Sequence, residues 1–393
     1  MKSILFVYHA SNIGGGTYCL LNILKEIDRN KYQPIVLLRT NGDLVREIKA
    51  LSIEVRYMPE MTLVPYNHPM TRKVRKTYQR IAASMPAFER VLDEVKPDAV
   101  YLNTMMLAPY LETVKKKGCR TVIHLREHWP LDENVEQLNN LQWIITNYAD
   151  EIIAINGYSA SMMPEREATI VYDWIDMSKR YEPSPFDEIF HEDASKLKVF
   201  LFTGGLQDIK GAAEVVDTFK KHIIGSDKRL LMVGVELHPN YKGLKNKVRL
   251  LLSKVGYNVY EYKVRKKIAS DSRIVCIPAT YAMKHIMEQA YCNLSCFTIP
   301  HANLAMAESI ILGTVPVAAK TVESIEYSCG GEMAVLFKLG DERDMLTKLR
   351  WLNGHYDEMK ERIARDGHKV AELFDTKRNV AVLHSVLERL FKN

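Results

Sequence analysis

The sequence predicts an α/β protein made of two doubly wound parallel sheets. Short apolar or β-branched runs alternate with helical patterns through both halves of the chain, as in parallel sheets covered by helices. The chain has 393 residues, which is too long for one ordinary core. A charged, proline-containing stretch at 176–196 interrupts the alternation. We therefore expect one domain at 1–175, a linker at 176–196 and a second domain at 197–375.

The first half opens with a strand pattern at 4–9. Residues 1–7 resemble the start of a secretion signal, but the apolar run ends at Tyr8 and His9 without a small-residue cleavage site. The clearest helices lie at 17–27 and at 107–117, before the stop signal Gly118. Further strands are expected at 34–38, 54–57, 99–102, 121–125, 151–155 and 169–172.

The second half repeats the alternation. Helical patterns occupy 211–221, 245–254 and 282–291, and the tail from 342 to 393 is expected to be helical throughout. Strand patterns lie at 197–202, 229–233, 273–277, 294–297, 315–318 and 334–337. Because open parallel sheets bind ligands beyond the carboxyl ends of their strands, the side chains that follow these strands are the candidates for a site.

Composition excludes several functional classes. The chain is 47% apolar, and 54 basic residues against 48 acidic ones give a net charge of +6, which is mild for a nucleic-acid binder. The six cysteines form no CxxC pair, which indicates reduced thiols in a cytoplasmic protein. No apolar run approaches the length needed to span a bilayer, so membrane association would be peripheral.

Two turns in the second half suggest a nucleotide-sugar site. The run from Phe202 to Gly211 contains Gly204, Gly205 and Lys210, and it follows a strand and precedes a helix, where backbone N–H groups hold anions such as a diphosphate. A lysine at the first turn of a helix opposes the helix dipole unless an anion lies between them. Lys210 is therefore interpreted as an anion ligand rather than a solvated surface lysine.

The second turn leads from His301 into an apolar helix that carries Glu308. A carboxylate among apolar neighbours needs a partner or a ligand. Its oxygens suit sugar hydroxyls, and the alternative is a structural salt bridge.

In the first half, polar groups also follow the strands. Gly14, Gly15 and Gly16 let the backbone approach a phosphate or a sugar, although a tight turn without a ligand explains them equally well. Asn103 could bind an acceptor hydroxyl or serve only as a turn former, and the turn is the simpler interpretation.

A dense polar cluster closes the strand at 121–125. It consists of His124, Arg126, Glu127 and His128 and favours a functional role over simple solvation. No third ligand at a suitable spacing supports a metal site, and no Asp-x-Asp pair is present. We therefore expect a metal-independent site.

Taken in order, these motifs resemble the GT-B fold glycosyltransferases of family GT4 over nearly the whole chain. Gly14–Gly16 matches the amino-terminal glycine loop, His124 the strand-end histidine and 171–176 the segment that closes the first domain. The turn at 204–211 matches the diphosphate-binding turn, 231–234 the next strand end, and Glu308 with 313–317 the donor-binding helix. The resemblance implies two Rossmann-like domains facing across a cleft, the first for the acceptor and the second for the donor, with a final helix at 376–392 that crosses back to the first domain.

The resemblance also implies roles for single residues. Lys210 contacts the donor diphosphate, Glu308 contacts the ribose, and His124 lies beside the transferred sugar. The set implied for the donor is Gly15, Gly16, Gly204, Gly205, Lys210, Asn303, Leu304, Ala305 and Glu308, and the set for the acceptor or sugar side is Asn103, Arg126, Glu127 and His301.

The chain departs from the family pattern at two positions. Gly205 replaces the arginine that usually accompanies the lysine, and Pro300 replaces the first glutamate of the Glu-x7-Glu pattern. Arg126 is the residue expected to replace the lost charge.

The implied reaction moves a hexosyl or related sugar from a nucleotide-diphosphate sugar to an acceptor hydroxyl with retention of configuration and without a cofactor. Lys210, with the amides of Asn303 to Ala305, would stabilise the departing diphosphate. The expected setting is polysaccharide or glycolipid synthesis, with a saccharide or lipid-linked saccharide as acceptor. The basic run from Arg72 to Arg80 is either a solvated helix face or a docking surface for anionic lipid on the inner membrane face.

Two other functions remain open. An NADP-dependent oxidoreductase is suggested by the glycine turn, but Cys19 occupies the last glycine position of GxGxxG and Arg39 ends the second strand. A non-catalytic sugar-nucleotide-binding homologue is suggested by Pro300, and it would bind a donor without transferring the sugar.

Overall fold

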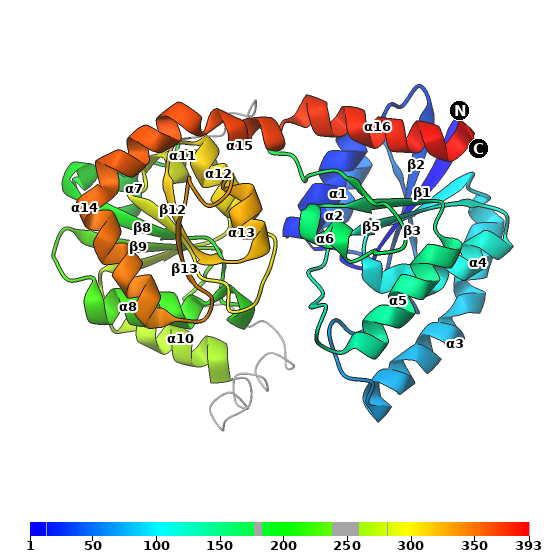
Figure 1. Cartoon of the computed structure of the whole chain (residues 1–393), viewed down its shortest axis with the longest axis horizontal. Helices are drawn as coiled ribbons and strands as arrows, with labels where there is room; N and C mark the ends of the chain where they lie inside the picture. The colour runs from blue at the N-terminus through cyan, green and yellow to red at the C-terminus, as the bar shows by residue number, and fades with distance from the viewer. Residues whose placement is uncertain (13, 177–182, 238–258, 281, 393) are drawn as a thin grey trace. The chain divides into compact units, whose positions relative to one another are not determined.

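The computed structural model describes residues 1–12, 14–176, 183–237, 259–280 and 282–392. The chain forms two compact units, one made of 1–175 with 374–393 and the other of 176–373. Each unit is a parallel sheet covered by helices on both faces (Figure 1). The predicted helix at 245–254 lies outside the described residues.

The first unit contains a seven-stranded sheet in the order β3-β2-β1-β4-β5-β6-β7. Its strands are β1 (Lys2–Tyr8), β2 (Tyr32–Leu38), β3 (Glu54–Tyr57), β4 (Ala99–Leu102), β5 (Arg120–Leu125), β6 (Glu151–Ala154) and β7 (Thr169–Ile170). Its helices are α1 (Gly15–Glu26), α2 (Asp43–Ala50), α3 (Arg72–Val95), η1 (Met105–Tyr110), α4 (Leu111–Lys116), α5 (Val135–Tyr148), α6 (Gly157–Ser161) and α16 (Thr376–Lys392). The strand order reverses between β1 and β4, which is where doubly wound sheets bind ligands.

Alternating side chains of this sheet build two cores. On one face, residues such as Phe6 and Tyr101 pack against α1, α2 and α16. On the other face, residues such as Val7 and Leu102 pack against α3, η1, α4 and α5. The inner strands of the sheet are buried on both faces, which explains why their sequences are mostly apolar, whereas the edge strand β3 is largely exposed.

The second unit contains a six-stranded sheet in the order β10-β9-β8-β11-β12-β13. Its strands are β8 (Lys198–Phe202), β9 (Lys228–Val233), β10 (Ile274–Ile277), β11 (Cys292–Ser295), β12 (Val315–Lys320) and β13 (Val335–Lys338). Its helices are α7 (Phe186–Phe190), η2 (Ala194–Lys196), η3 (Asp208–Lys210), α8 (Ala212–His222), α10 (Val259–Ala269), α11 (Met283–Gln289), α12 (Leu304–Ile311), α13 (Val322–Tyr327), α14 (Glu342–Asp366) and α15 (His368–Leu373). Here the order reverses between β8 and β11.

The predicted fold class, two doubly wound parallel sheets, is confirmed. Two helix predictions are wrong in detail. The helix expected at 107–117 begins as the 3-10 turn η1, which contains Pro109, and becomes α-helical only at Leu111. The tail is not one helix, because α14, α15 and α16 are separate and His355 inside α14 has non-helical angles.

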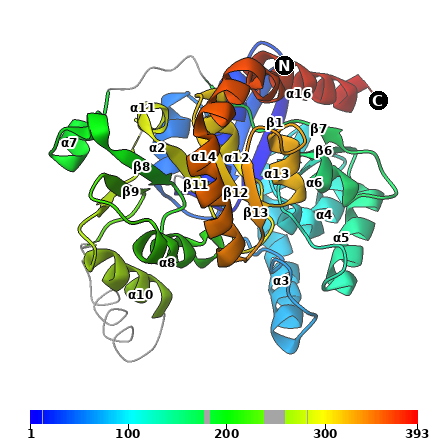
Figure 2. The same cartoon turned by 60° about the vertical axis from the view of Figure 1, so that its left-hand side comes forward.

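No described helix combines the length and the apolar character needed to cross a lipid bilayer. In Figures 1 and 2, the amino end of α3 projects beyond the other labelled helices of its unit.

Candidate functional site

The turn after β8 is held closely against the end of β11. Gly211 has φ +74°, and a Cβ atom there would lie 1.8 Å from the carbonyl oxygen of Cys296. The Thr298 N–H donates to the Ile209 carbonyl oxygen at 3.1 Å. Gly204 and Gly205 lie in the same turn, where a Cβ on Gly204 would lie 2.5 Å from the Phe202 ring and Gly205 has φ +64°. The glycines therefore allow two strand ends to meet at the point where the strand order reverses.

This contact places the Lys210 ammonium on an aromatic ring. Its Nζ lies 4.1 Å from the centroid of the Phe297 ring, and the His301 ring lies 5.1 Å from the same ring. Lys210 forms no ion pair with any described residue, and burial lowers its pKa to about 8. A partly buried ammonium without a counter-ion is destabilised, and an anionic ligand would reverse that effect.

Glu308 lies in a pocket of about 260 Å³ at the same edge of the sheet. The lining residues are Thr203, Val233, Gly234, Ala279, Thr280, Met283, Met287, Ala305 and Glu308. Burial raises the pKa of Glu308 to about 7, and the charge of Lys284 opposes this shift. The carboxylate accepts no hydrogen bond from the described part of the chain, so it is available to ligand hydroxyls.

The start of α12 forms one wall of this pocket. Asn303 caps the helix, because its side chain accepts a hydrogen bond from the Met306 N–H at 3.3 Å. Leu304 and Ala305 form the first turn, and Ala305 lines the pocket. The structure thus brings Ala305 and Glu308 into one pocket, while the side chain of Asn303 is committed to the cap.

In the first unit, the glycine loop packs against a tyrosine. A Cβ on Gly16 would lie 2.3 Å from the Tyr8 hydroxyl, whereas a Cβ on Gly15 would meet no atom within 4 Å. The Gly14 N–H donates to Thr17 Oγ1 at 2.7 Å at the start of α1. Close packing therefore accounts for Gly16, and Gly15 alone is open to a ligand.

His124 is buried at the end of β5. Its side chain is 1% exposed, and its Nδ1 lies 2.7 Å from the Tyr101 hydroxyl. Its Nε2 is buried and has no hydrogen-bond partner among the residues described. Burial, aided by the charge of Arg126, holds the pKa of His124 well below its usual value, so the ring is neutral.

Arg126 is paired within its own unit. Its two terminal nitrogens donate to the Asp173 carboxylate at 2.8 to 2.9 Å, and its Nε donates to Asn103 Oδ1 at 2.9 Å. Burial disfavours the charged guanidinium, but the Asp173 charge outweighs this effect and raises the pKa of Arg126. The guanidinium therefore already has a counter-ion, which weakens the prediction that it replaces the charge lost at Gly205.

Glu127 is held in place by hydrogen bonds from residues of its own unit. It accepts hydrogen bonds from the Thr104 hydroxyl and from the Met105 N–H, the latter at 3.0 Å, and so caps η1. His128 stacks on Tyr158 with ring centroids 3.8 Å apart. These contacts give both residues a local structural role.

Sequence reasoning missed four partners of the predicted site residues. They are Tyr101, Asp173, Lys284 and Phe297. Asp173 and Phe297 each follow a strand, which is a weak signal that could have been used. Tyr101 and Lys284 carry no local signal.

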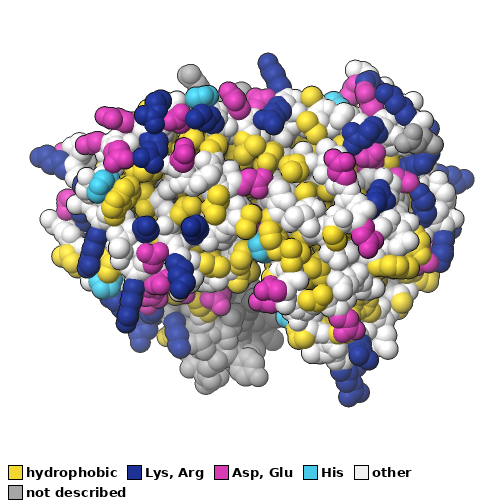
Figure 3. All heavy atoms as spheres, viewed as in Figure 1, with side chains coloured by type: hydrophobic (Ala, Val, Ile, Leu, Met, Phe, Trp, Pro, Cys, Tyr) yellow, Lys and Arg dark blue, Asp and Glu magenta, His cyan; other side chains and the backbone are white. Residues whose placement is uncertain are grey.

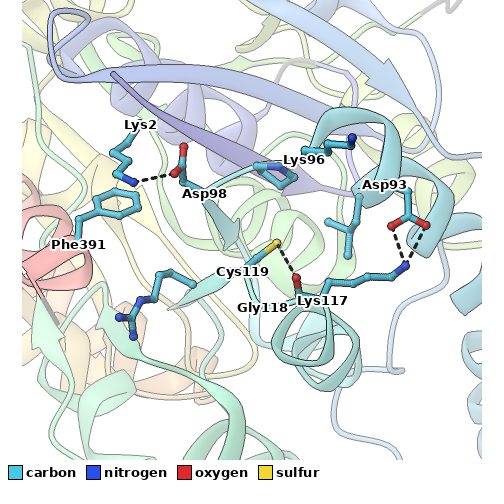
Figure 4. Close-up of a pocket in the computed structure, with 11 residues that line it drawn as sticks. Lys2, Asp93, Lys96, Asp98, Lys117, Gly118, Cys119 and Phe391 are labelled. Carbon is cyan, nitrogen blue, oxygen red and sulfur yellow. Dashed lines mark hydrogen bonds and ion pairs between the residues drawn. The ribbon is translucent and has the colours of Figure 1, made fainter.

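A larger concave region lies at the opposite edge of the first sheet. It measures about 890 Å³ and surrounds the amino ends of β1, β4 and β5 (Figure 4). Its cations are mostly paired, Lys2 with Asp98 and Lys117 with Asp93. Because ligands of doubly wound sheets bind at the carboxyl edge, this region is not the candidate site.

Among the described residues, no three His, Cys, Asp or Glu side chains come together as metal ligands would.

No protein-family model matches the chain, and no curated protein matches it. The chain does match solved structures. HepE of Anabaena, solved in complex with UDP-glucose, superposes with a TM-score of 0.75 at 16% identity and covers 100% of both chains. Sucrose-phosphate synthase of Thermosynechococcus elongatus gives 0.72 at 11% identity over 100% of both chains. A glycosyltransferase of Rickettsia africae gives 0.71 at 14% identity, over 100% of this chain and 99% of that one.

These likenesses extend over the whole chain and agree with the two doubly wound sheets, each with its reversal of strand order. The chain therefore has the GT-B fold.

Proposed function

We propose that this protein is a glycosyltransferase that moves a sugar from a nucleotide-diphosphate sugar to an acceptor hydroxyl. One observation carries the proposal. At the same edge of one sheet, the Lys210 ammonium has no counter-ion and the Glu308 carboxylate has no hydrogen-bond donor among the described residues. A diphosphate matches the first group and ribose hydroxyls match the second. HepE, of the same fold, was solved with UDP-glucose.

In this proposal the second unit binds the donor and the first unit binds the acceptor. Lys210 stabilises the negative charge that grows on the leaving diphosphate, together with the N–H groups at the start of α12. The transfer retains the anomeric configuration and needs no metal, and the chain acts as a family GT4 enzyme in polysaccharide or glycolipid synthesis. The acceptor is a saccharide or a lipid-linked saccharide.

A thermal-shift screen of UDP-, GDP-, ADP-, TDP- and CMP-linked sugars, with EDTA present, tests the donor site. A ligand bound only by the folded protein raises its apparent stability. We expect one nucleotide class to raise the melting temperature and Lys210→Ala to abolish that rise. Lys266→Ala is the matched control, since Lys266 is exposed on α10 in the same unit. Equal shifts in both variants would contradict the site.

Binding without transfer or hydrolysis would favour the non-catalytic alternative. Incubation of the identified donor with saccharide acceptors, followed by NMR of the anomeric proton, distinguishes the two and reports whether configuration is retained.

We also propose that the amino half of α3 docks on an anionic lipid surface. Arg72, Lys73, Arg75, Lys76 and Arg80 are exposed, and none forms an ion pair with a described residue. The first turn of α3 has no acidic residue, so Arg72 and Lys73 lie unfavourably at the positive end of the helix dipole. A negatively charged surface offsets that cost. Basic side chains gather where this helix begins (Figure 3).

Co-sedimentation with phosphatidylcholine vesicles, with and without phosphatidylglycerol, tests the docking surface. Each basic residue near an anionic membrane contributes about 1 kcal/mol. Replacing Arg72, Lys73 and Lys76 by Gln should therefore abolish binding to the anionic vesicles and leave donor binding intact. The control replaces Arg343, Lys348 and Arg350 of α14 by Gln. Equal loss in the control, or binding to neutral vesicles, would contradict the proposal.

A further inference from the structure

Buried nitrogen atoms without a hydrogen-bond partner among the described residues lie at the carboxyl edge of the first sheet, on the side chains of His9, Asn103 and His124. Nε2 of His124 and Nδ2 of Asn103 belong to neighbouring strand ends. In the sheet register, Leu102 of β4 pairs with Ile123 of β5, so Asn103 and His124 occupy equivalent positions in neighbouring strands. Both side chains are buried, at 0% and 1% exposure. Unused hydrogen-bonding groups in a protein interior are uncommon and call for an explanation.

Tyr101 determines which nitrogen of His124 carries the proton. The Tyr101 hydroxyl lies 2.7 Å from His124 Nδ1 and makes no other hydrogen bond with the described residues. A buried phenol proton is costly to leave unbonded, so the hydroxyl donates it to Nδ1. A neutral ring whose Nδ1 accepts a hydrogen bond carries its own proton on Nε2. His124 therefore presents an N–H donor at its free position.

Arg126 determines the orientation of Asn103 in the same way. Its Nε donates to Asn103 Oδ1 at 2.9 Å, and the ion pair with Asp173 holds the guanidinium in place. Because the amide oxygen faces this donor, the amide nitrogen takes the other position. Asn103 also presents an N–H donor at its free position.

We propose that Tyr101 and Arg126 are positioning residues, which fix His124 and Asn103 as hydrogen-bond donors to an uncharged hydroxyl or carbonyl oxygen of the ligand. His124 then binds an oxygen and does not accept a proton from it. That this oxygen belongs to a sugar rests on the proposed function, whereas the positions of the protons do not.

Nitrogen-15 NMR of the histidine rings tests the proton positions without any substrate. The protein is labelled with ¹⁵N-histidine, and the His124 signals are assigned by their loss in His124→Gln. We expect the pattern of a neutral ring protonated at Nε2, and a shift toward a mixture of both tautomers in Tyr101→Phe. Tyr110→Phe is the matched control, because Tyr110 is another buried tyrosine of this unit and bonds to Ser84 and Thr62 instead.

A wild-type ring protonated at Nδ1 or at both nitrogens would overturn the proposal, as would an unchanged pattern in Tyr101→Phe. Once a donor and acceptor are known, Tyr101→Phe should lower kcat/KM about tenfold, the size of one hydrogen bond, and Tyr110→Phe should not. Equal kcat/KM in wild type and Tyr101→Phe would overturn the positioning role. The expected NMR pattern in a protein that transfers no sugar would support the proton positions and reject the proposed function.

Discussion

At the scale of single residues, the most informative charged side chains are those that have no ion-pair or hydrogen-bond partner among the described residues. Lys210 has an aromatic ring beneath it and no counter-ion among the described residues, and Glu308 lines a pocket that is otherwise mostly apolar. Arg126 is the contrasting case, because a bidentate ion pair with Asp173 already satisfies it. The first two side chains are therefore the candidates for ligand binding, and the third supports the structure around it.

The first prediction concerns the pH dependence of donor binding. The pKa of Lys210 is lowered to about 8. The side chain is therefore a charged ammonium below about pH 8, and it loses its proton and its charge as the pH rises above that value. The affinity for the nucleoside diphosphate of the donor identified in the thermal-shift screen, measured by calorimetry, should fall above about pH 8 by at most about tenfold per pH unit. Lys210→Ala should bind weakly with no such slope, and Lys266→Ala should keep it. A flat wild-type profile from pH 7 to 10 would show that Lys210 does not contact the diphosphate.

The second prediction concerns stability. Burial raises the pKa of Glu308 to about 7 in the folded protein, above its ordinary value of 4.5. The folded state therefore holds this proton more tightly, and the free energy of unfolding falls as the pH rises from about 4.5 to 7. Glu308→Gln removes the buried charge and should stabilise the second unit on the order of 1 kcal/mol at pH 8 and hardly at all near pH 4.5.

Urea unfolding at the two pH values measures this difference. Glu288→Gln, an exposed carboxylate on α11, is the control and should change neither value. A destabilised Glu308→Gln at pH 8 would show that the carboxylate is held by a favourable contact.

The sequence pointed to Lys210 and Glu308 through local context alone. Lys210 stands where a helix is expected to begin, and Glu308 stands among apolar residues. Tyr101 and Asp173 were not identified, because their partners His124 and Arg126 lie 23 and 47 residues away and only the folded sheet brings them together. Whether the predicted residues act as assigned stays a prediction.

Among the elements, the turn after β8 is the one whose geometry depends most on a single residue. Gly211 and Gly313 have similar positive φ values, +74° and +78°, but only a Cβ on Gly211 meets backbone, at 1.8 Å from the Cys296 carbonyl oxygen. An alanine substitution at each of the two positions therefore measures two costs separately: that of the left-handed backbone conformation at Gly313, and that of the same conformation plus the contact with Cys296 at Gly211.

The third prediction uses that pair. Gly313→Ala should lose about 1 kcal/mol, the cost of the left-handed conformation. Gly211→Ala should lose more than about 3 kcal/mol, since the turn must also move away from β11, and it should bind no donor. Urea unfolding and thermal shift with the donor measure both effects. Similar losses in the two variants would show that the turn adapts freely.

At the level of elements, apolar runs predicted most strands because the inner strands of both sheets are buried on both faces. The interruptions of the helices were harder to predict. Pro109 allows a 3-10 turn to start the segment at 105–116. His355 departs from helical angles directly after Gly354, a residue that weakens a helix interior.

The first unit is discontinuous in sequence. After the chain has built the second unit, α16 returns to the first, where Leu383, Val386, Leu387 and Leu390 join the core beside Phe6 and Tyr101. This helix is therefore part of the first unit's core.

The fourth prediction follows from this arrangement. Leu387 is 0% exposed, and Leu387→Ala should cost about 2–5 kcal/mol. Hydrogen exchange should speed up within 1–175 and stay unchanged within 176–373. Lys377→Ala, an exposed change on the same helix, should alter neither region. Faster exchange in both regions would show that the units unfold together.

A ribosome makes α16 after every other element of the first unit. Until it emerges, one face of the first sheet lacks the apolar side chains that finish its cover, although the strands were synthesised long before. The second unit has all of its own segments by then and can fold first. Newly made protein is thus exposed to aggregation through its amino-terminal portion, and a chaperone that holds that portion until α16 has been made would raise the yield of native protein.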